Sequence, residues 1–370
     1  MDGTNIPGRS LKHQILLLGA GKIGSLIALR LAASGRYEVH LADRNLSAAK
    51  AAAKIKGITP LCLAADNQAK LDKYLSHHRF IALVSALPYH CNPLLAQLAR
   101  DHQLHYLDLT EDREVTCQIK EISQGAKQAF IPQCGLAPGF ISIVTADLIE
   151  HFQEIDQVKM RVGALPLHPH NSLKYSLTWS TDGLINEYGN PCQAIRKGEL
   201  VQLKPLDGYE TLEFDGLLYE AFNTSGGLGN LAESQLTKVN NMDYKTLRYP
   251  GHAEKIRFLM DDLKLNQHRG ELKCILERAI PRTLQDVVLV YVSVIGWRSG
   301  ELFEENYYKK IYSQELEGET WSAIQVTTAS SLCCILDLLF ENETQYQGVI
   351  PQETFPLSAF LANPFGQIFL

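Results

Sequence analysis

A glycine-rich loop near the start of the chain stands directly between an apolar run and a helix pattern. Residues 14–18 form the apolar run, and residues 22–33 place apolar side chains along one face of a helix. The loop between them, Gly19-Ala-Gly-Lys-Ile-Gly24, has the pattern GxGxxG. In such a unit the glycines permit a tight turn, close approach to a pyrophosphate and tight helix packing, and the helix N-terminus binds phosphate oxygens. The loop therefore predicts a dinucleotide site formed by Gly19, Ala20, Gly21, Lys22, Ile23 and Gly24.

Strand and helix patterns alternate through the first third of the chain. The predicted strands are 14–18, 37–42, 60–63, 80–87, 105–109 and 130–134, and the predicted helices are 22–33, 46–55, 68–75, 93–101 and 114–126. Parallel neighbours in a sheet need crossover connections of this kind. We therefore expect an α/β fold with a doubly wound parallel sheet, the Rossmann arrangement, over residues 1–137.

The pattern changes after Pro138. The expected strands are 157–162, 172–179, 198–204 and 287–294, and the expected helices are 142–151, 183–187, 252–262, 271–279 and 322–340. This order predicts an α+β, mixed-sheet domain over 138–320 for substrate binding and dimerisation. Residues 321–370 are expected to return to the first domain.

The composition excludes several classes of protein. A net charge of −6 argues against a general nucleic-acid binder. The first ten residues have no apolar signal-peptide core, and the apolar stretch 329–340 is too short for a membrane span and contains Asp337. The eight cysteines form no CxxC pair, and His168-Pro-His170 has no third ligand beside it, so no metal site is expected. A cytoplasmic protein without membrane or nucleic-acid partners is the expectation.

An acidic residue after the second predicted strand bears on the cofactor. Asp43 lies 19 residues beyond Gly24, where a carboxylate accepts both ribose hydroxyls of a dinucleotide and repels a 2′-phosphate. This position predicts NAD. The neighbouring Arg44 keeps NADP open, because a guanidinium there would receive a 2′-phosphate. The loop after the fourth strand is expected to cover the cofactor ribose through Ser85, Ala86, Leu87 and Pro88.

Several longer motifs resemble the saccharopine dehydrogenase family, and more narrowly its short lysine 6-dehydrogenase-like branch. The octapeptide Lys245-Thr-Leu-Arg-Tyr-Pro-Gly-His252 is the most specific of them. The others are Val84-Ser-Ala-Leu-Pro88, His105-Tyr-Leu-Asp-Leu109, Cys134-Gly-Leu-Ala-Pro-Gly139, Thr178-Trp-Ser180, Asp182-Gly-Leu-Ile-Asn-Glu-Tyr188 and Thr224-Ser-Gly-Gly227. The resemblance implies a Rossmann domain, a mixed-sheet substrate domain, a returning C-terminal segment, and a homodimer or higher homo-oligomer.

The resemblance also implies an activity and site residues. Members of the family use a nicotinamide cofactor to oxidise a C–N bond at a lysine side chain, or run the reverse condensation. By this resemblance Asp66 would lie near the adenine, and Asp108 and Cys134 near the nicotinamide. Arg248, in a loop before a helix and with Lys245 and Thr246 nearby, would receive a substrate carboxylate, which suits the forked donors of arginine.

Hydride removal from an amine carbon requires the amine to be neutral, so a base or an apolar pocket is expected. The sequence leaves Asp108, His252 and Glu187 as alternative bases. Tyr175 and Trp179 could form an apolar wall for the lysine methylenes, with core packing as an equally good account.

The sequence thus leads to an NAD-dependent dehydrogenase that converts L-lysine to its 6-semialdehyde. A saccharopine oxidoreductase is the alternative, and its substrate carries three carboxylates and needs further cations. A carboxypolyamine-forming enzyme and a catalytically silent dinucleotide sensor also remain open.

Overall fold

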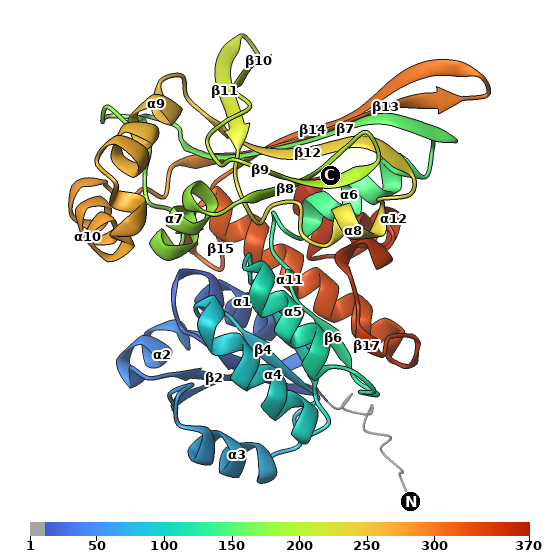
Figure 1. The fold of residues 1–370 in the computed structure, drawn as a ribbon. Coiled ribbons are helices and arrows are strands. Elements are labelled where there is room, and N and C mark those ends of the chain that lie inside the picture. The colour runs from blue at the N-terminus through green and yellow to red at the C-terminus, as the bar shows by residue number, and fades with distance from the viewer. Residues whose placement is uncertain (1–11) are drawn as a thin grey trace, which may run out of the picture.

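The computed structural model describes residues 12–370, which form two parts, one built around a parallel sheet and the other around a mixed sheet (Figure 1). The first ten residues, in which no signal peptide was expected, lie outside this range. The parallel sheet has the order β17-β6-β5-β4-β1-β2-β3, and every pairing in it is parallel. Its strands are β1 (His13–Leu18), β2 (Tyr37–Asp43), β3 (Ile58–Cys62), β4 (Ala82–Ser85), β5 (His105–Asp108), β6 (Ala129–Ile131) and β17 (Gly348–Val349). The predicted Rossmann arrangement is confirmed.

The crossover helices begin where polar side chains cap them. Asn45, Asn67 and Asp112 each accept a hydrogen bond from a backbone N–H of the following first turn. The helices of this part are α1 (Lys22–Ala33), α2 (Leu46–Ala52), α3 (Gln68–Ser76), α4 (Asn92–Asp101) and α5 (Arg113–Ile122), with the 3₁₀ turn η1 (Tyr89–Cys91). The helix expected over 46–55 ends early because Ala53 leaves the helical region at ψ 60°.

The second sheet is mixed, as predicted, since β12 pairs with β7 in parallel and the remaining pairings are antiparallel. Its main path is β10-β11-β12-β7-β13-β14, and β8 joins β9 to β12. The strands are β7 (Glu154–Pro166), β8 (Cys192–Arg196), β9 (Glu199–Leu203), β10 (Glu210–Phe214), β11 (Leu217–Asn223), β12 (Val239–Arg248), β13 (Asp286–Arg298) and β14 (Glu301–Tyr312).

Short helices surround this sheet. They are α6 (Phe140–Ile149), α7 (Thr181–Gly189), α8 (Leu231–Ser234), α9 (His252–Arg257), the π-helical turn η2 (Phe258–Asp262), the 3₁₀ turn η3 (Leu265–Gln267) and α10 (Arg269–Ala279). Helices α7 and α10 lie between the mixed sheet and the dinucleotide-binding part in Figure 1. Their placement brings polar residues of both helices to the space between the two parts.

Two local predictions in this part are wrong. Residues 172–179 form no strand, because the side chain of Asn171 occupies both the N–H and the C=O of Tyr175. Arg248 is the last residue of a strand and does not lie in a loop.

The C-terminal segment packs back on the first part, as predicted. Helix α11 (Ala323–Glu341) lies along α1, and β17 adds to the parallel sheet beside β6. The hydroxyl of Tyr37 donates to Asp337 on α11 over 2.6 Å. The segment is completed by β15 (Gln314–Leu316), β16 (Glu319–Trp321), η4 (Glu343–Gln345), η5 (Gln352–Thr354), α12 (Leu357–Ala362) and η6 (Gly366–Phe369).

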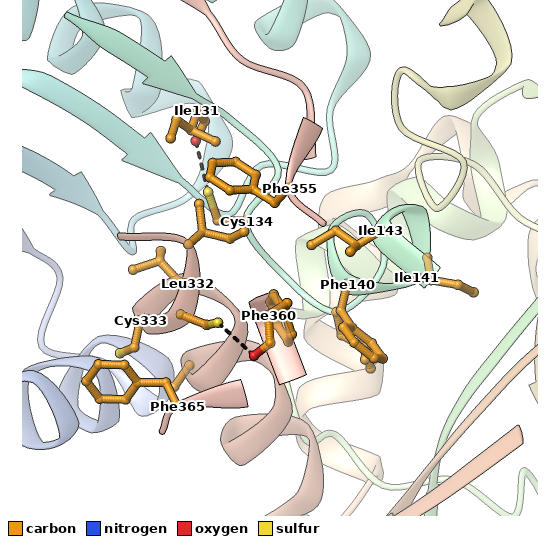
Figure 2. Packing of buried hydrophobic residues seen from close by; sticks show 14 of the residues in the cluster. Ile131, Cys134, Phe140, Ile141, Ile143, Leu332, Cys333, Phe355, Phe360 and Phe365 are labelled. Carbon is orange, nitrogen blue, oxygen red and sulfur yellow. Dashed lines mark hydrogen bonds between the residues drawn. The ribbon is translucent and has the colours of Figure 1, made fainter. Parts of the chain in front are cut away.

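An apolar core joins this segment to both sheets (Figure 2). Phe140 of α6 and Phe360 of α12 face each other with ring centroids 5.1 Å apart, and Cys333 and Leu332 of α11 lie close by. Helix α11 is long and apolar enough to cross a membrane by length and composition, but most of that apolar stretch is buried inside the protein. It is therefore accounted for as a core helix.

Candidate functional site

A cavity of about 610 Å³ lies between the two parts of the molecule. One wall consists of the loops at the carboxyl ends of β4, β5 and β6, where ligands bind in doubly wound sheets. The opposite wall consists of α7, α10 and the end of β12. The volume suits a small molecule together with the reactive part of a cofactor.

The glycine loop at this edge has the geometry of a phosphate cradle. Gly19 has φ +103°, and a β-carbon on it would lie 2.8 Å from the carbonyl oxygen of Ala86. A β-carbon on Gly24 would collide with the carbonyl oxygen of Gly19, so helix α1 packs directly on the loop. A β-carbon on Gly21 would meet no atom within 4 Å, which leaves room for a pyrophosphate. The loop therefore fits a dinucleotide.

Two side chains of this loop face the substrate part. Lys22 donates from Nζ to the carbonyl oxygen of Leu177 over 3.3 Å, and Ile23 lines the cavity. The loop thus contacts both parts of the molecule.

The carboxylate of Asp43 is engaged by backbone. Its Oδ2 accepts from the N–H of Ala20 over 2.9 Å, and its Oδ1 accepts from the N–H of Asn45 over 2.8 Å. The adjacent Arg44 is exposed and forms no ion pair with any residue between 12 and 370. Asp66 is exposed in the turn after β3. Asp43 therefore holds the glycine loop by a hydrogen bond from its backbone, and the exposed Arg44 is available to bind an anion.

The loop after β4 lies over the same edge. Ala86, Leu87 and Pro88 line the cavity. The hydroxyl of Ser85 is buried and donates to Oδ1 of Asn92 over 2.7 Å, so it holds the loop to the start of α4.

Asp108 and Cys134 lie behind the cavity wall and are not among the residues that line it. Asp108 is fully buried and accepts from the Tyr106 hydroxyl and from the N–H groups of Thr110 and Gln133. Burial raises its pKa to about 6. The Cys134 thiol donates to the carbonyl of Ile131, as Figure 2 shows, and burial raises its pKa. Asp108 thus closes the turn after β5, and its position argues against the predicted role of base.

Strand β12 places alternate residues on opposite faces. Tyr244, Thr246 and Arg248 line the cavity. Lys245 lies on the other face, where its Nζ is 3.0 Å from Oε2 of Glu210. This placement argues against the predicted substrate contact of Lys245.

Arg248 is 3% exposed and projects from the end of β12. Its Nε donates to the Tyr188 hydroxyl over 2.9 Å, and its guanidinium lies 4.9 Å from the centre of the Tyr175 ring. Among residues 12–370, no carboxylate comes within 4.0 Å of it. A buried cation without an ion-pair partner is costly, so the arrangement is suited to an anionic ligand.

His252 supports this arginine from behind. Its Nδ1–H donates to the carbonyl of Leu173 over 2.7 Å, so Nε2 accepts from the Tyr188 hydroxyl over 3.0 Å. Burial lowers the pKa of His252 to about 3, and the residue does not line the cavity. It is a neutral positioning residue here, in contrast to the predicted role of base.

The two predicted wall residues have different positions. Trp179 lines the cavity, and its Nε1 donates to the Tyr175 hydroxyl over 3.2 Å. Tyr175 is buried beneath Arg248 and does not line the cavity.

Glu187 is the predicted base that the structure brings to the cavity. It is 8% exposed, and burial raises its pKa to about 8.

The sequence interpretation missed Glu111, Arg269 and Lys273, which line the same cavity. Glu111 lies two residues after the predicted strand 105–109, a position that could have marked it, whereas the two cations lie on a helix that no motif singles out.

The comparisons with known proteins agree with this architecture. The saccharopine dehydrogenase NADP binding domain matches residues 15–129, and the saccharopine dehydrogenase C-terminal domain matches residues 135–367. The structure resembles apo saccharopine dehydrogenase (L-Glu forming) from Saccharomyces cerevisiae, with a TM-score of 0.75 at 16% identity over 92% of this chain and 94% of that one.

The curated relatives that match are longer proteins, of which this chain covers only a part. Mouse alpha-aminoadipic semialdehyde synthase, mitochondrial, is 21% identical over 87% of this chain and 36% of its own length. Saccharopine dehydrogenase [NADP(+), L-glutamate-forming] from Schizosaccharomyces pombe is 25% identical over 67% of this chain and 57% of its own length. The chain therefore spans between about a third and three fifths of these relatives.

These matches correct the cofactor prediction. The expectation of NAD is wrong, because the matching family domain is an NADP binding domain and relatives from three fungi are named for NADP(+). The side chain that fits a 2′-phosphate is Arg44, which is exposed directly beside Asp43. With both family domains matched over nearly the whole length described, the chain belongs to the saccharopine dehydrogenase family.

Proposed function

We propose that this protein is an NADP-dependent oxidoreductase that cleaves or forms the secondary amine of saccharopine, with L-glutamate as one product of cleavage. The observation that carries the proposal is the buried guanidinium of Arg248, which faces the cavity without a carboxylate partner among residues 12–370. Such a group requires an anionic ligand, and a substrate carboxylate fits the forked donors of arginine.

Further cations favour saccharopine over lysine. Arg269 and Lys273, on α10, line the same cavity as Arg248. Arg269 donates to Oδ1 of Asn186 over 2.9 Å, and Lys273 lies 2.6 Å from Oδ2 of Asp182. Saccharopine carries three carboxylates, whereas lysine carries one. Arg248 and Arg269, which form no ion pair among residues 12–370, support the larger substrate, and Lys273 would have to share its charge with Asp182.

The glycine loop and Arg44 are the proposed holders of NADP. The loop would take the pyrophosphate through Gly19, Gly21 and Gly24, and Arg44 would take the 2′-phosphate. When bound, the nicotinamide supplies the acceptor or donor of hydride. The loop Ala86–Pro88 lines the cavity beside this site, so the two ligands would meet there.

The remaining task of the chain is to control the proton on the substrate nitrogen. Hydride removal from carbon needs a neutral amine, and Glu187 is a cavity-lining carboxylate whose pKa burial raises to about 8. Leu136, Ile185 and Trp179 supply an apolar wall that excludes water from the aliphatic part of the substrate.

The test is formation of NADPH by the purified protein at mildly alkaline pH. L-Saccharopine and L-lysine are compared, each with NADP and with NAD, and glutamate and ammonia are measured as products. Turnover of saccharopine with NADP and release of glutamate supports the proposal. Turnover of lysine alone, with release of ammonia, replaces it with a deaminating lysine dehydrogenase, and binding of NADP with no turnover of either amine points to a dinucleotide sensor.

A further inference from the structure

Two glutamates from different parts of the chain meet at the same cavity. Glu111 follows the carboxyl end of β5, and Glu187 lies on α7. Glu187 is 8% exposed, and neither carboxylate accepts a hydrogen bond from another residue in the described range 12–370. Glu111 is half-buried, and a carboxylate withdrawn from water without a donor is costly unless a ligand supplies one.

The side chain of Glu111 reaches the face of α7 that carries Gly183 and Glu187. A β-carbon on Gly183 would lie 2.8 Å from Oε1 of Glu111 and would collide with the indole of Trp179. Gly183 and Glu187 are four residues apart, so they lie one above the other on that face. The carboxylate of Glu111 therefore lies about one helical turn, roughly 5 Å along the axis, from the position of Glu187.

The loop after β11 fixes both residues from the far side. The N–H of Ser225 donates to the carbonyl of Glu187 over 3.0 Å. A β-carbon on Gly226, which has φ +87°, would lie 2.9 Å from the carbonyl of Glu111. Because one loop contacts the backbone of both glutamates, their spacing is set by the fold.

The surroundings bring the pKa values of both carboxyl groups close to neutral pH, where each group can gain or lose a proton. Burial raises the pKa of Glu111 to about 7, and the charges of Asp112, Asp108 and Asp182 raise it further. Burial also raises the pKa of Glu187 to about 8; the charge of Arg248 opposes this shift and the charge of Glu111 adds to it. The other titratable and charged groups that line the cavity with the pair or whose charges act on it are Arg248, Arg269, Lys273, Tyr175, Tyr188, Tyr244, Cys192, Asp108, Asp112 and Asp182.

We propose that Glu111 and Glu187 together bind the reacting amino nitrogen of the substrate and that one of them accepts its proton. The proposal rests on the proposed function, because it assigns this role within the same cavity. In this step an N–H bond of the ammonium breaks and an O–H bond forms on a carboxylate oxygen. Nothing is oxidised or reduced until the later hydride transfer, for which NADP⁺ is the oxidant.

The arrangement divides the cavity by charge. Arg248, Arg269 and Lys273 serve the carboxylates of the substrate, and the two glutamates serve its nitrogen. A dicarboxylate that lacks nitrogen would use the cations alone. This difference allows the acidic pair to be tested separately from the cationic wall.

The test compares Glu111→Gln and Glu187→Gln with the wild-type protein, using L-saccharopine as substrate and glutarate as a nitrogen-free competitive inhibitor. Each substitution should raise the KM for saccharopine by roughly 10-fold or more, as expected for a lost charged hydrogen bond, and leave inhibition by glutarate unchanged. The change in kcat/KM near neutral pH that the ionisation of the acidic pair causes should be absent from the pH profiles of the variants. Glu114→Gln, at an exposed position on α5, is the matched control and should alter none of these.

Unchanged KM and pH profile in both variants would overturn the proposal, as would an equal loss of saccharopine and glutarate affinity. Failure of the proposed function has a different signature, since the wild-type protein would then form no NADPH from saccharopine. In that case calorimetric titration with L-lysine tests the pair. Binding by the wild-type protein that weakens in both glutamine variants supports the acidic pair, and equal binding or no binding overturns it.

Discussion

The Nε–H of Arg248 donates to the hydroxyl of Tyr188 over 2.9 Å, and this hydroxyl in turn donates to the neutral ring of His252. The guanidinium is thereby held in one orientation before any ligand arrives. Its Nη1 also donates to the carbonyl of Leu247 over 2.8 Å. Because Arg248 lines the cavity and forms no ion pair with a carboxylate of residues 12–370, ligand binding need not break an existing ion pair. Such preorganisation lowers the cost of binding an anion.

Arg248→Lys tests this clamp. Lysine keeps the charge but has neither the fork nor the Nε–H that bonds Tyr188. We expect the KM for saccharopine to rise roughly 10-fold or more, with a smaller change in kcat. Steady-state kinetics measure the effect, and Arg298→Lys, at the far hairpin of β13 and β14, serves as control. An unchanged KM would place the carboxylate site elsewhere in the cavity.

Arg44→Ala tests the assignment of the 2′-phosphate. Loss of a guanidinium that binds a phosphate should raise the Kd for NADPH roughly 10-fold, while the Kd for NADH stays the same. Fluorescence titration with each cofactor measures both constants. Lys50→Ala removes an exposed cation from the neighbouring α2 and should leave both unchanged. An equal effect of Arg44→Ala on the affinity for both cofactors would show that Arg44 does not bind the 2′-phosphate.

Gly24→Ala tests the contact between α1 and the glycine loop. The added methyl group collides with the carbonyl oxygen of Gly19, so the helix must move away from the phosphate site. We expect NADPH affinity to fall by roughly 10-fold or more, because the loop loses its close backbone approach. Gly270→Ala is the control for a helical glycine, since its β-carbon would meet no atom within 4 Å. Retention of wild-type affinity by Gly24→Ala would show that the loop tolerates the shift.

Glu187→Gln should change how stability depends on pH. Burial raises the pKa of Glu187 from 4.5 to about 8, so between these values the folded protein binds more protons than the unfolded chain. The free energy of unfolding therefore falls as pH rises through this interval, by at most about 1.4 kcal/mol per pH unit from this group. The glutamine variant should lose less stability than the wild-type protein between pH 5 and pH 8. Urea unfolding at both values measures the difference, and parallel curves would contradict the burial of an ionisable Glu187.

Much of the first part could be predicted because its inner strands are buried on both faces, as β4 and β5 are throughout, whereas the outer strand β3 is only partly buried. Helix α1 begins and ends where expected, and the glycine loop lies between strand and helix as its spacing indicates. The mixed sheet was harder to predict. Strand β12 buries Asp243, Lys245, Thr246 and Arg248, so its polar residues conceal the alternation that marks a strand.

The candidate site was only partly predictable for a related reason. Arg248 and Glu187 belong to motifs, and the resemblance pointed to them. Glu111 lies in the turn after β5, and Arg269 and Lys273 lie on α10, so the three residues come together only in the folded protein, where both elements line the cavity. Lys245 and Arg248 are neighbours in one motif, but the two-residue period of the strand sends them to opposite faces. Local sequence contains no direct signal for the meeting of distant elements at the cavity, nor for the strand that places Lys245 and Arg248 on opposite faces.

The position of β17 has a consequence for the order in which the protein can be made. The edge strand of the dinucleotide-binding sheet is Gly348–Val349, paired with a strand whose last residue is Ile131. During synthesis the first six strands leave the ribosome long before the seventh, and the mixed sheet must emerge between them. Helix α11, which covers α1, also arrives late. The nascent first part therefore keeps an open sheet edge and an uncovered apolar flank until α11 and β17 have been made, after the whole mixed sheet.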